Sequence, residues 1–144
     1  MDEPGGPQIR DETEHLEALV LDQPAIQLSQ YCSMRADRDF DTATLRLSGE
    51  FDLACEERFQ EEFDEALSEP ARSVVLDLRG LDFMDSTGLR ILVQIDARAR
   101  RDKFEFVVLS GDGHVRYVLR ESGLDGVLPV VDGAGPVPAS DSPL

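Results

Sequence analysis

A short polar segment, Asp85-Ser86-Thr87-Gly88, carries the side chains best suited to chemistry in this sequence. It follows the apolar run 73–78 and precedes apolar residues at helical spacing, so we expect it at the start of a helix. There the Ser86 hydroxyl would cap free backbone N–H groups, and the helix dipole would tolerate a phosphate on it. The pattern predicts a modifiable hydroxyl, although a helix cap without further function explains the same residues.

The residues after Ser86 extend this candidate site along the helix. Arg90 lies four positions on, where it could face a phosphate on Ser86, and Gln94 continues the same side. We therefore expect Ser86, Arg90 and Gln94 to form an exposed stripe. Gly88 leaves room for close approach by a partner or by a neighbouring strand. The side chains expected to face inward are Leu89, Leu92 and Val93.

Other reactive side chains offer weaker chemistry. Ser86 as a hydrolase nucleophile would need a base, and no recognisable motif supplies His15 or His114 for that role. His114 also lacks partners at metal-ligand spacing, so we expect a surface residue near a helix start. Cys32 and Cys55 are expected to be buried or partly buried free thiols, with redox sensing as the alternative.

Composition limits the classes of partner. The 144 residues include 14 Lys and Arg against 30 Asp and Glu, a formal net charge of −16. Nucleic acid and anionic membrane surfaces would repel such a chain. No apolar run reaches the roughly 20 residues that span a bilayer, and the acidic N-terminus is unlike a signal peptide. We therefore expect a cytoplasmic protein that binds neither nucleic acid nor membrane.

The distribution of residue types predicts one folded unit with two polar ends. Residues 1–24 are rich in Asp and Glu, and we expect a mostly disordered acidic arm. Residues 132–144 are rich in Gly, Pro and Ser, which predicts a flexible tail. The segment 25–131 between them is long enough for one core.

Hydrophobic periodicity places the elements that position the candidate site. A polar link is expected at 36–41 and a loop at 50–52, where Asp52 would cap the following helix. The order ββαβαβαβ predicts an α/β domain with a mixed sheet that begins with a hairpin. The predicted strands are 26–34, 43–48, 73–78, 104–109 and 127–131, and the predicted helices are 53–67, 86–101 and 113–121.

Three segments together resemble a known family. Phe83–Leu89, following Val74–Leu78, resembles the signature of the STAS domain of bacterial anti-sigma factor antagonists. Leu47–Asp52 resembles the first strand-loop signature of that family, and Val118–Leu124 its late helix-to-strand signature. The resemblance covers roughly residues 26–131 and implies a single STAS-like domain.

The resemblance implies a switch protein and not an enzyme. In that family an anti-sigma factor with serine kinase activity phosphorylates the serine that follows the motif's aspartate, which corresponds to Ser86. The unphosphorylated antagonist binds the anti-sigma factor and frees the sigma factor, and a serine phosphatase resets the switch. ATP belongs to the partner, so no cofactor or metal is expected in this chain. The family's contact surface corresponds to Glu50, Asp52, Asp85, Ser86, Thr87 and Gly88, which Arg90 and Gln94 would extend.

Charge supplies a mechanism for such a switch. A phosphate would add about −1.5 to −2 charge beside Asp82 and Asp85, and a tight interface formed on the bare hydroxyl would be lost without refolding. Two alternatives stay open at this point. Thr87 is a second hydroxyl next to Ser86, and a STAS module could instead bind a small ligand or scaffold a stress-signalling complex without a phosphoswitch.

Overall fold

The first half of the sheet is antiparallel. In the computed structural model, which describes residues 24–133, the chain opens with β1 (Ile26–Ser29), β2 (Cys32–Asp39) and β3 (Thr42–Phe51). β1 pairs with β2 and β2 pairs with β3, both in antiparallel register. The expected N-terminal hairpin is therefore present, and a further strand precedes it.

The additional strand corrects the sequence prediction of a single strand over 26–34. A two-residue turn at Gln30-Tyr31 divides that segment, and the polar link expected at 36–41 is strand as far as Asp39. The real turn is Phe40-Asp41, where Phe40 adopts a positive φ of 57°. Hairpin turns of this kind usually contain Gly or Asn, and these residues identify the turn in a sequence. Neither turn contains such a residue. The first turn was not predicted, and the second lies at the end of the polar link predicted at 36–41.

The second half alternates helices with parallel strands. The helices are α2 (Glu56–Ala66), α3 (Ser86–Asp102) and α4 (His114–Glu121), and two short 3-10 helices are η1 (Leu53–Cys55) and η2 (Leu124–Gly126). The strands are β4 (Ser73–Met84), β5 (Glu105–Leu109) and β6 (Val130–Val131). From β3 onward neighbours are parallel, and the strands lie in the sheet in chain order from β1 to β6. The α/β class and the mixed sheet are confirmed, with the order βββαβαβαβ.

β3 and β4 are both longer than predicted. Glu50 and Phe51, expected in a loop, are the last residues of β3, and β4 continues six residues past Leu78 to Met84. The pairing Phe51↔Met84 closes this extension, and the register shifts after Arg46 and Gly49. The strands therefore carry the candidate site beyond the edge that the apolar pattern marked.

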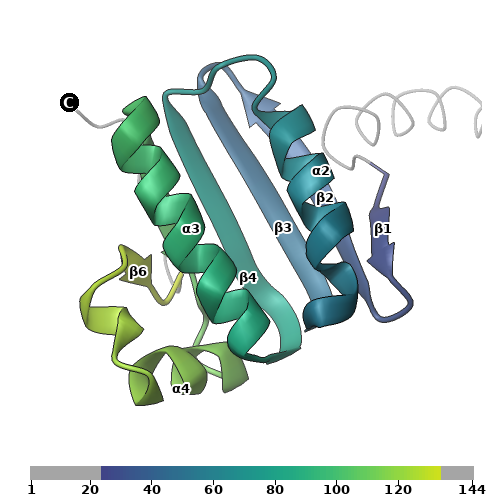
Figure 1. The fold of residues 1–144 in the computed structure, drawn as a ribbon, viewed down its shortest axis with the longest axis vertical. Helices are drawn as coiled ribbons and strands as arrows, with labels where there is room; N and C mark the ends of the chain where they lie inside the picture. Colours follow the sequence, from purple (N-terminus) through teal and green to yellow (C-terminus); the bar gives the residue numbers. More distant parts are fainter. Residues whose placement is uncertain (1–23, 134–144) are drawn as a thin grey trace, which may run out of the picture.

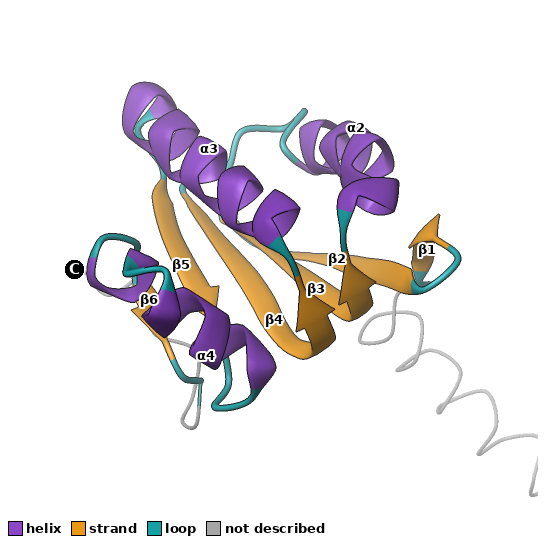
Figure 2. Ribbon diagram, turned by 60° about the horizontal axis from the view of Figure 1, so that its bottom comes forward, coloured by secondary structure: helices purple, strands orange, loops and turns teal. Residues whose placement is uncertain are grey.

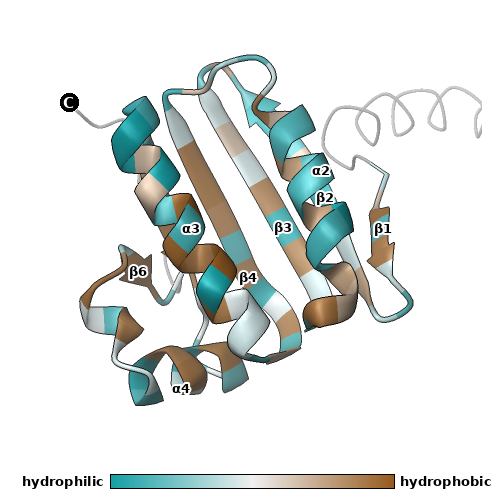
Figure 3. Cartoon of the chain, viewed as in Figure 1, coloured by the Kyte–Doolittle hydropathy of each residue, from teal (hydrophilic) through white to brown (hydrophobic). Residues whose placement is uncertain are grey.

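α2 and α3 cover one face of the sheet (Figures 1 and 2). Phe59 and Phe63 of α2 are fully buried, and Phe59 meets Phe51 of β3 edge to face at 5.3 Å between ring centroids. The outward side of α2 is hydrophilic in Figure 3, as its run of glutamates predicted. The core residues that these helices cover include Leu45, Leu47, Val74, Leu76 and Leu78.

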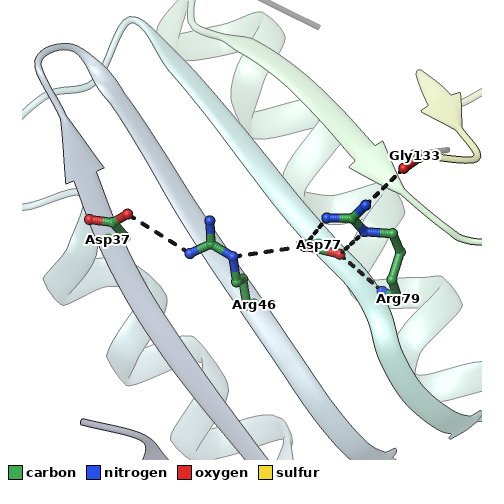
Figure 4. A network of polar contacts seen from close by, with 5 residues as sticks. All are labelled: Asp37, Arg46, Asp77, Arg79 and Gly133. Atoms are coloured by element: carbon green, nitrogen blue, oxygen red, sulfur yellow. Dashed lines mark hydrogen bonds and ion pairs between the residues drawn. The ribbon is translucent and has the colours of Figure 1, made fainter. Parts of the chain in front are cut away.

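The opposite face carries a network of charged side chains (Figure 4). Asp77 is only 6% exposed, and Arg79 donates to both of its carboxylate oxygens at 2.9 and 2.8 Å. Arg46 lies 3.9 Å from Asp77 and also from Asp37. Burial pushes the pKa of Asp77 upward, but the hydrogen bonds and charge of Arg79 outweigh it, so that pKa lies below its ordinary value. Arg79 also donates to the Gly133 carbonyl at 2.8 Å.

Two predicted segments lie almost entirely outside the described residues. The expected acidic arm covers residues 1–24 and the expected tail covers 132–144, whereas the structure describes 24–133. Within that described part, no helix is both long enough and apolar enough to cross a membrane.

Candidate functional site

The candidate residues gather where β3 and β4 end side by side. The Asp85 amide donates to the Phe51 carbonyl at 3.3 Å, and the Glu50 amide donates to the Tyr31 carbonyl at 2.8 Å. These bonds join the end of β3 to the β4–α3 connection and to the β1–β2 turn. We call this region the carboxyl edge, defined as residues 30–31, 50–55, 83–88 and 113–114; it lies at the bottom of the molecule in Figure 1.

Ser86 is the first residue of α3 and is exposed. The prediction that its hydroxyl caps the helix is wrong, because Asp85 holds the cap position. The Asp85 backbone is extended, with φ −104° and ψ −166°, and its carboxylate accepts from the Thr87 amide at 2.9 Å. Aspartate and serine cap helices about equally well, so only the path of the chain decides between them. Ser86 is consequently left at the surface.

Thr87 and Gly88 are buried beneath Ser86. Thr87 is 7% exposed. A Cβ added to Gly88 would lie 2.3 Å from Met84 Cγ and 3.1 Å from a ring carbon of Phe51. Of the two uses that the sequence allowed for Gly88, close approach to a neighbouring strand is the one seen. Of the two adjacent hydroxyls, that of Ser86 is the exposed one.

The predicted stripe of Ser86, Arg90 and Gln94 is exposed along its whole length. It also binds α2. Arg90 meets Glu56 through two hydrogen bonds of 2.6 and 2.9 Å, and the Gln60 side-chain amide donates to Gln94 at 3.4 Å. The contact raises the pKa of Arg90 and lowers the pKa of Glu56.

Three such contacts join the two helices at equal sequence separation. Glu56 pairs with Arg90, Gln60 with Gln94 and Asp64 with Arg98, each 34 residues apart. Both members of each pair advance by four residues, which is one helical turn. The helices therefore run in the same direction, as consecutive crossovers of a parallel sheet require.

Of the three side chains expected to face inward, Val93 does not. Leu92 is fully buried and Leu89 is half-buried, whereas Val93 is 45% exposed. The buried line of α3 runs through Ile91, Leu92 and Ile95, and at 100° per residue Val93 falls outside it.

Four carboxylates lie at or next to the carboxyl edge, and two of them accept hydrogen bonds from the backbone. Asp52 caps η1 as predicted, accepting from the Ala54 amide at 3.0 Å. Asp85 caps α3, as described above. Glu50 and Asp82 are exposed at the ends of β3 and β4.

Exposed apolar side chains complete the carboxyl edge, and the sequence analysis missed them. Leu53 is 68% exposed, Tyr31 is 61% exposed and Phe83 is 40% exposed. Their signal was weak but present: Leu53 falls outside the apolar spacing of its helix, and Phe83 directly follows Asp82 and lies two residues before Asp85. All three belong to the segments that define the carboxyl edge, where exposed apolar surface favours an interaction site.

His114 begins α4 and is exposed, in agreement with its prediction as a surface residue near a helix start. Its ring stacks on Phe83 with centroids 5.3 Å apart, and Nε2 lies 3.4 Å from the Met84 carbonyl. These contacts hold the Phe83 ring in place. Across residues 24–133, no three His, Cys, Asp or Glu side chains converge as metal ligands.

Cys32 and Cys55 are free thiols, and both are buried, at 1% and 0% exposure. The interaction between the two thiols raises the pKa of Cys32 and lowers the pKa of Cys55. The expected default of buried free thiols is confirmed.

Comparisons with known proteins agree on one family. The family described as "Mlab, STAS domain" matches residues 34–131. A Bordetella bronchiseptica protein named as a candidate anti-sigma factor antagonist, BtrV, is 33% identical over 86 residues, which is 60% of this chain and 74% of that protein. The anti-sigma F factor antagonist of Paenibacillus polymyxa is 32% identical over 89 residues, covering 61% of this chain and 76% of that one.

Solved structures share the fold. An anti-sigma factor antagonist from Mycobacterium paratuberculosis matches with a TM-score of 0.58 at 21% identity, covering 69% of this chain and 84% of its own. The anti-sigma factor antagonist SpoIIAA, solved in its unphosphorylated form, matches with a TM-score of 0.59 at 21% identity. The match covers 68% of this chain and 85% of that one.

Proposed function

The chain belongs to the STAS-domain family, and from that premise we propose that it acts as an anti-sigma factor antagonist. Without a phosphate, its carboxyl edge binds an anti-sigma factor that is also a serine kinase, and the sigma factor is released. Phosphorylation of Ser86 ends the binding, and a serine phosphatase restores it. The protein thereby regulates transcription without contacting DNA. The names of both sequence relatives support the general role.

The exposure of Ser86 at the first position of α3 is the observation that carries this proposal. A kinase needs a hydroxyl that it can reach, and Thr87 is 7% exposed while Ser86 is at the surface. The backbone there is already fixed by the Asp85 cap. A phosphate at this position would face the positive end of the helix dipole, so the fold should persist in both states.

The surroundings of Ser86 explain how one phosphate would end binding. An interface over the apolar side chains of Leu53 and Phe83 excludes water, and a phosphate would bring about −1.5 to −2 charge into it. Glu50 and Asp82 already make the surface acidic. A phosphorylated edge therefore loses binding through repulsion and through the desolvation of the new charge.

Burial refines the set of partner contacts. The polar contacts that we propose at the carboxyl edge are made by Glu50, Asp52, Asp85 and Ser86. The apolar surface comes from Leu53, Phe83 and Tyr31. Arg90 and Gln94 extend the contact along α3. Thr87 and Gly88 support the surface from beneath, because both are buried.

Site mapping tests the proposal. The chain is incubated with candidate anti-sigma serine kinases and Mg-ATP, and intact mass and peptide maps are recorded. We expect a single phosphate on Ser86, absent from Ser86→Ala and retained in the matched control Thr87→Val. Phosphate only at other residues, or none with every kinase tested, contradicts the phosphoswitch. Phosphate-independent binding of a small ligand or of a stress-signalling complex would then define the module instead.

A further inference from the structure

Two thiols meet beneath the carboxyl edge. Cys32 is the first residue of β2, and Cys55 is the last residue of η1, directly before α2. They are the only two cysteines in the 144 residues. Both are buried, at 1% and 0% exposure, and the proposed function uses neither of them.

The path of β3 brings these two cysteines together. Cys32 pairs with Gly49, whose positive φ of 102° and missing side chain let the Tyr31 carbonyl come close. Past Phe51, the Asp52 cap turns the chain back into η1. The Cys55 thiol donates to the Asp52 carbonyl at 3.0 Å, and Cys32 and Cys55 belong to the same buried core cluster.

We propose that Cys32 and Cys55 form a redox site that closes to an intramolecular disulfide when the oxidant is a hydroperoxide. The Cys55 thiolate attacks a peroxide oxygen and the O–O bond breaks, which leaves a sulfenic acid and, after protonation of the hydroxide, water. Cys32 then attacks the Cys55 sulfur, its S–H proton and the hydroxyl leave as water, and the S–S bond forms. In total, two thiols and one hydrogen peroxide give one disulfide and two waters, and an external dithiol reverses the change by exchange.

The order of attack follows from the environment of the two sulfurs. The hydrogen bond between the thiols raises the pKa of Cys32, and burial raises it further. The same hydrogen bond lowers the pKa of Cys55. Cys55 is therefore the better nucleophile at neutral pH, and Cys32 is the resolving thiol beside it.

The oxidant reaches this site through the edge of the sheet. β1 has only four residues, pairs only with β2 among the described strands, and has an irregular register between Gln27 and Ser29. Leu28 of β1 belongs to the same buried cluster as both cysteines. Short edge strands open locally at low free energy. Because β1 packs against η1, which ends at Cys55, such an opening uncovers the Cys55 thiol that the peroxide must reach.

A disulfide would change the carboxyl edge, and this consequence rests on the proposed function. Two sulfurs in hydrogen-bond contact must close to about 2.05 Å, which draws η1 toward the start of β2. η1 carries Leu53, and Asp52 caps it. Tyr31 adjoins Cys32 on the other side. We therefore expect the oxidised chain to bind the anti-sigma factor at least about tenfold more weakly.

Intact mass of the full chain tests the site without any substitution. The reduced chain is treated with hydrogen peroxide, then denatured and alkylated. We expect a monomer that is lighter by about 2 Da and takes up no alkyl group, with reversal by dithiothreitol. Because the chain has two cysteines, this result can only mean the bond between Cys32 and Cys55. Two alkylatable thiols, sulfinic acid without a disulfide, or dimers alone would overturn the proposal.

Binding then tests the consequence separately. The affinity of the anti-sigma factor is measured for reduced and oxidised chain, with Cys32→Ala under peroxide as the control that cannot close the bond. A tenfold loss that dithiothreitol reverses and Cys32→Ala lacks supports the coupling. Equal affinities of a chain shown to contain the disulfide would overturn it. A disulfide that forms in a chain whose reduced state binds no anti-sigma factor would instead contradict the proposed function.

Discussion

Ser86 and Thr87 are adjacent in the chain, but a partner can reach only the Ser86 hydroxyl. Ser86 is exposed and Thr87 is buried. The sequence could predict that a helix begins here, because Asp, Ser and Thr are all frequent at helix starts. For the same reason it could not say which of them caps the helix. That depends on the path of the chain, in which a hydrogen bond joins Asp85, the residue after β4, to Phe51, the last residue of β3.

The carboxylate of Asp85 caps α3 and also carries a negative charge. A pair of substitutions separates these two roles. Asp85→Asn keeps a capping oxygen and removes the charge, so we expect little change in the free energy of unfolding. Asp85→Ala removes the cap and should cost about 0.5–2 kcal/mol. Urea unfolding of both variants measures this difference. Equal destabilisation of the two would mean that the charge, and not the cap, is what α3 needs.

Arg90 should report on a phosphate at Ser86. It lies one turn along α3, and helical side chains lean toward the N-terminus of their helix. We expect Arg90 to stabilise the phosphate dianion, so that the second phosphate pKa is lower in wild type than in Arg90→Ala. Phosphorus NMR titration near the ordinary value of about 6 measures this.

Glu56 supplies the matched control for Arg90, because it holds that side chain toward α2. Glu56→Gln should weaken the contact between Arg90 and α2. Because Arg90 is then freer to face the phosphate on Ser86, the second pKa of that phosphate should fall further than in wild type. Identical titration curves for all three proteins would show that Arg90 stays with α2.

At the scale of elements, the apolar pattern predicted the three α-helices of residues 24–133 and failed at the strand ends. Continuous apolar runs such as 73–78 revealed the buried middle of β4. The continuation to Met84 mixes charged, apolar and glycine residues without a regular alternation, and its pairing with β3 shows that it is a strand. The turn at Gln30-Tyr31 lacks Gly and Pro, so the local sequence gave no sign of it, whereas the turn at Phe40-Asp41 lies within the polar link predicted at 36–41. The apolar side of the candidate site was missed because these strand ends expose it.

Gly88 tests how α3 is seated on those strand ends. Gly88→Ala would place a methyl group 2.3 Å from Met84 Cγ. We expect a loss of about 1–3 kcal/mol of unfolding free energy as α3 shifts. Gly126→Ala is the control, because nothing lies within 4 Å of its Cβ and its effect should be small. Thermal melts compare the two, and equal melting temperatures would contradict this account of Gly88.

At the scale of the whole molecule, the two faces of the sheet carry different kinds of side-chain contact. One face packs under α2 and α3 (Figure 1), and the carboxyl edge lies where β3 and β4 end. The other face carries the charged network of Asp37, Arg46, Asp77 and Arg79, which reaches Gly133 near the end of the described chain (Figure 4). The net charge of −16 predicted the classes of partner to exclude. The net charge could not predict that the carboxylate of Asp77 is buried and paired with Arg79.

The Asp77–Arg79 pair should make stability depend on pH. Since folding lowers the pKa of Asp77, its stabilisation is full above the ordinary pKa and is lost as pH falls through the folded value. Asp77→Asn should lose about 1–3 kcal/mol at neutral pH, toward the lower end because Arg79 is partly exposed. The variant should also lose less stability than wild type between pH 7 and pH 3.

Urea unfolding at a series of pH values measures the Asp77 effect, with Glu57→Gln on the exposed face of α2 as a surface control. The control should follow the wild-type curve. Parallel curves for wild type and Asp77→Asn would contradict the role given to this pair.

The most direct test of the central claim is the affinity of the anti-sigma factor for one chain in two states. Calorimetric titration compares the unphosphorylated protein with the same protein phosphorylated stoichiometrically at Ser86, and thermal melts verify that both are folded. We predict tight binding without the phosphate and a loss of roughly a hundredfold or more with it, because like charges in an interface cost several kcal/mol. Equal affinities of the two folded forms would contradict the account.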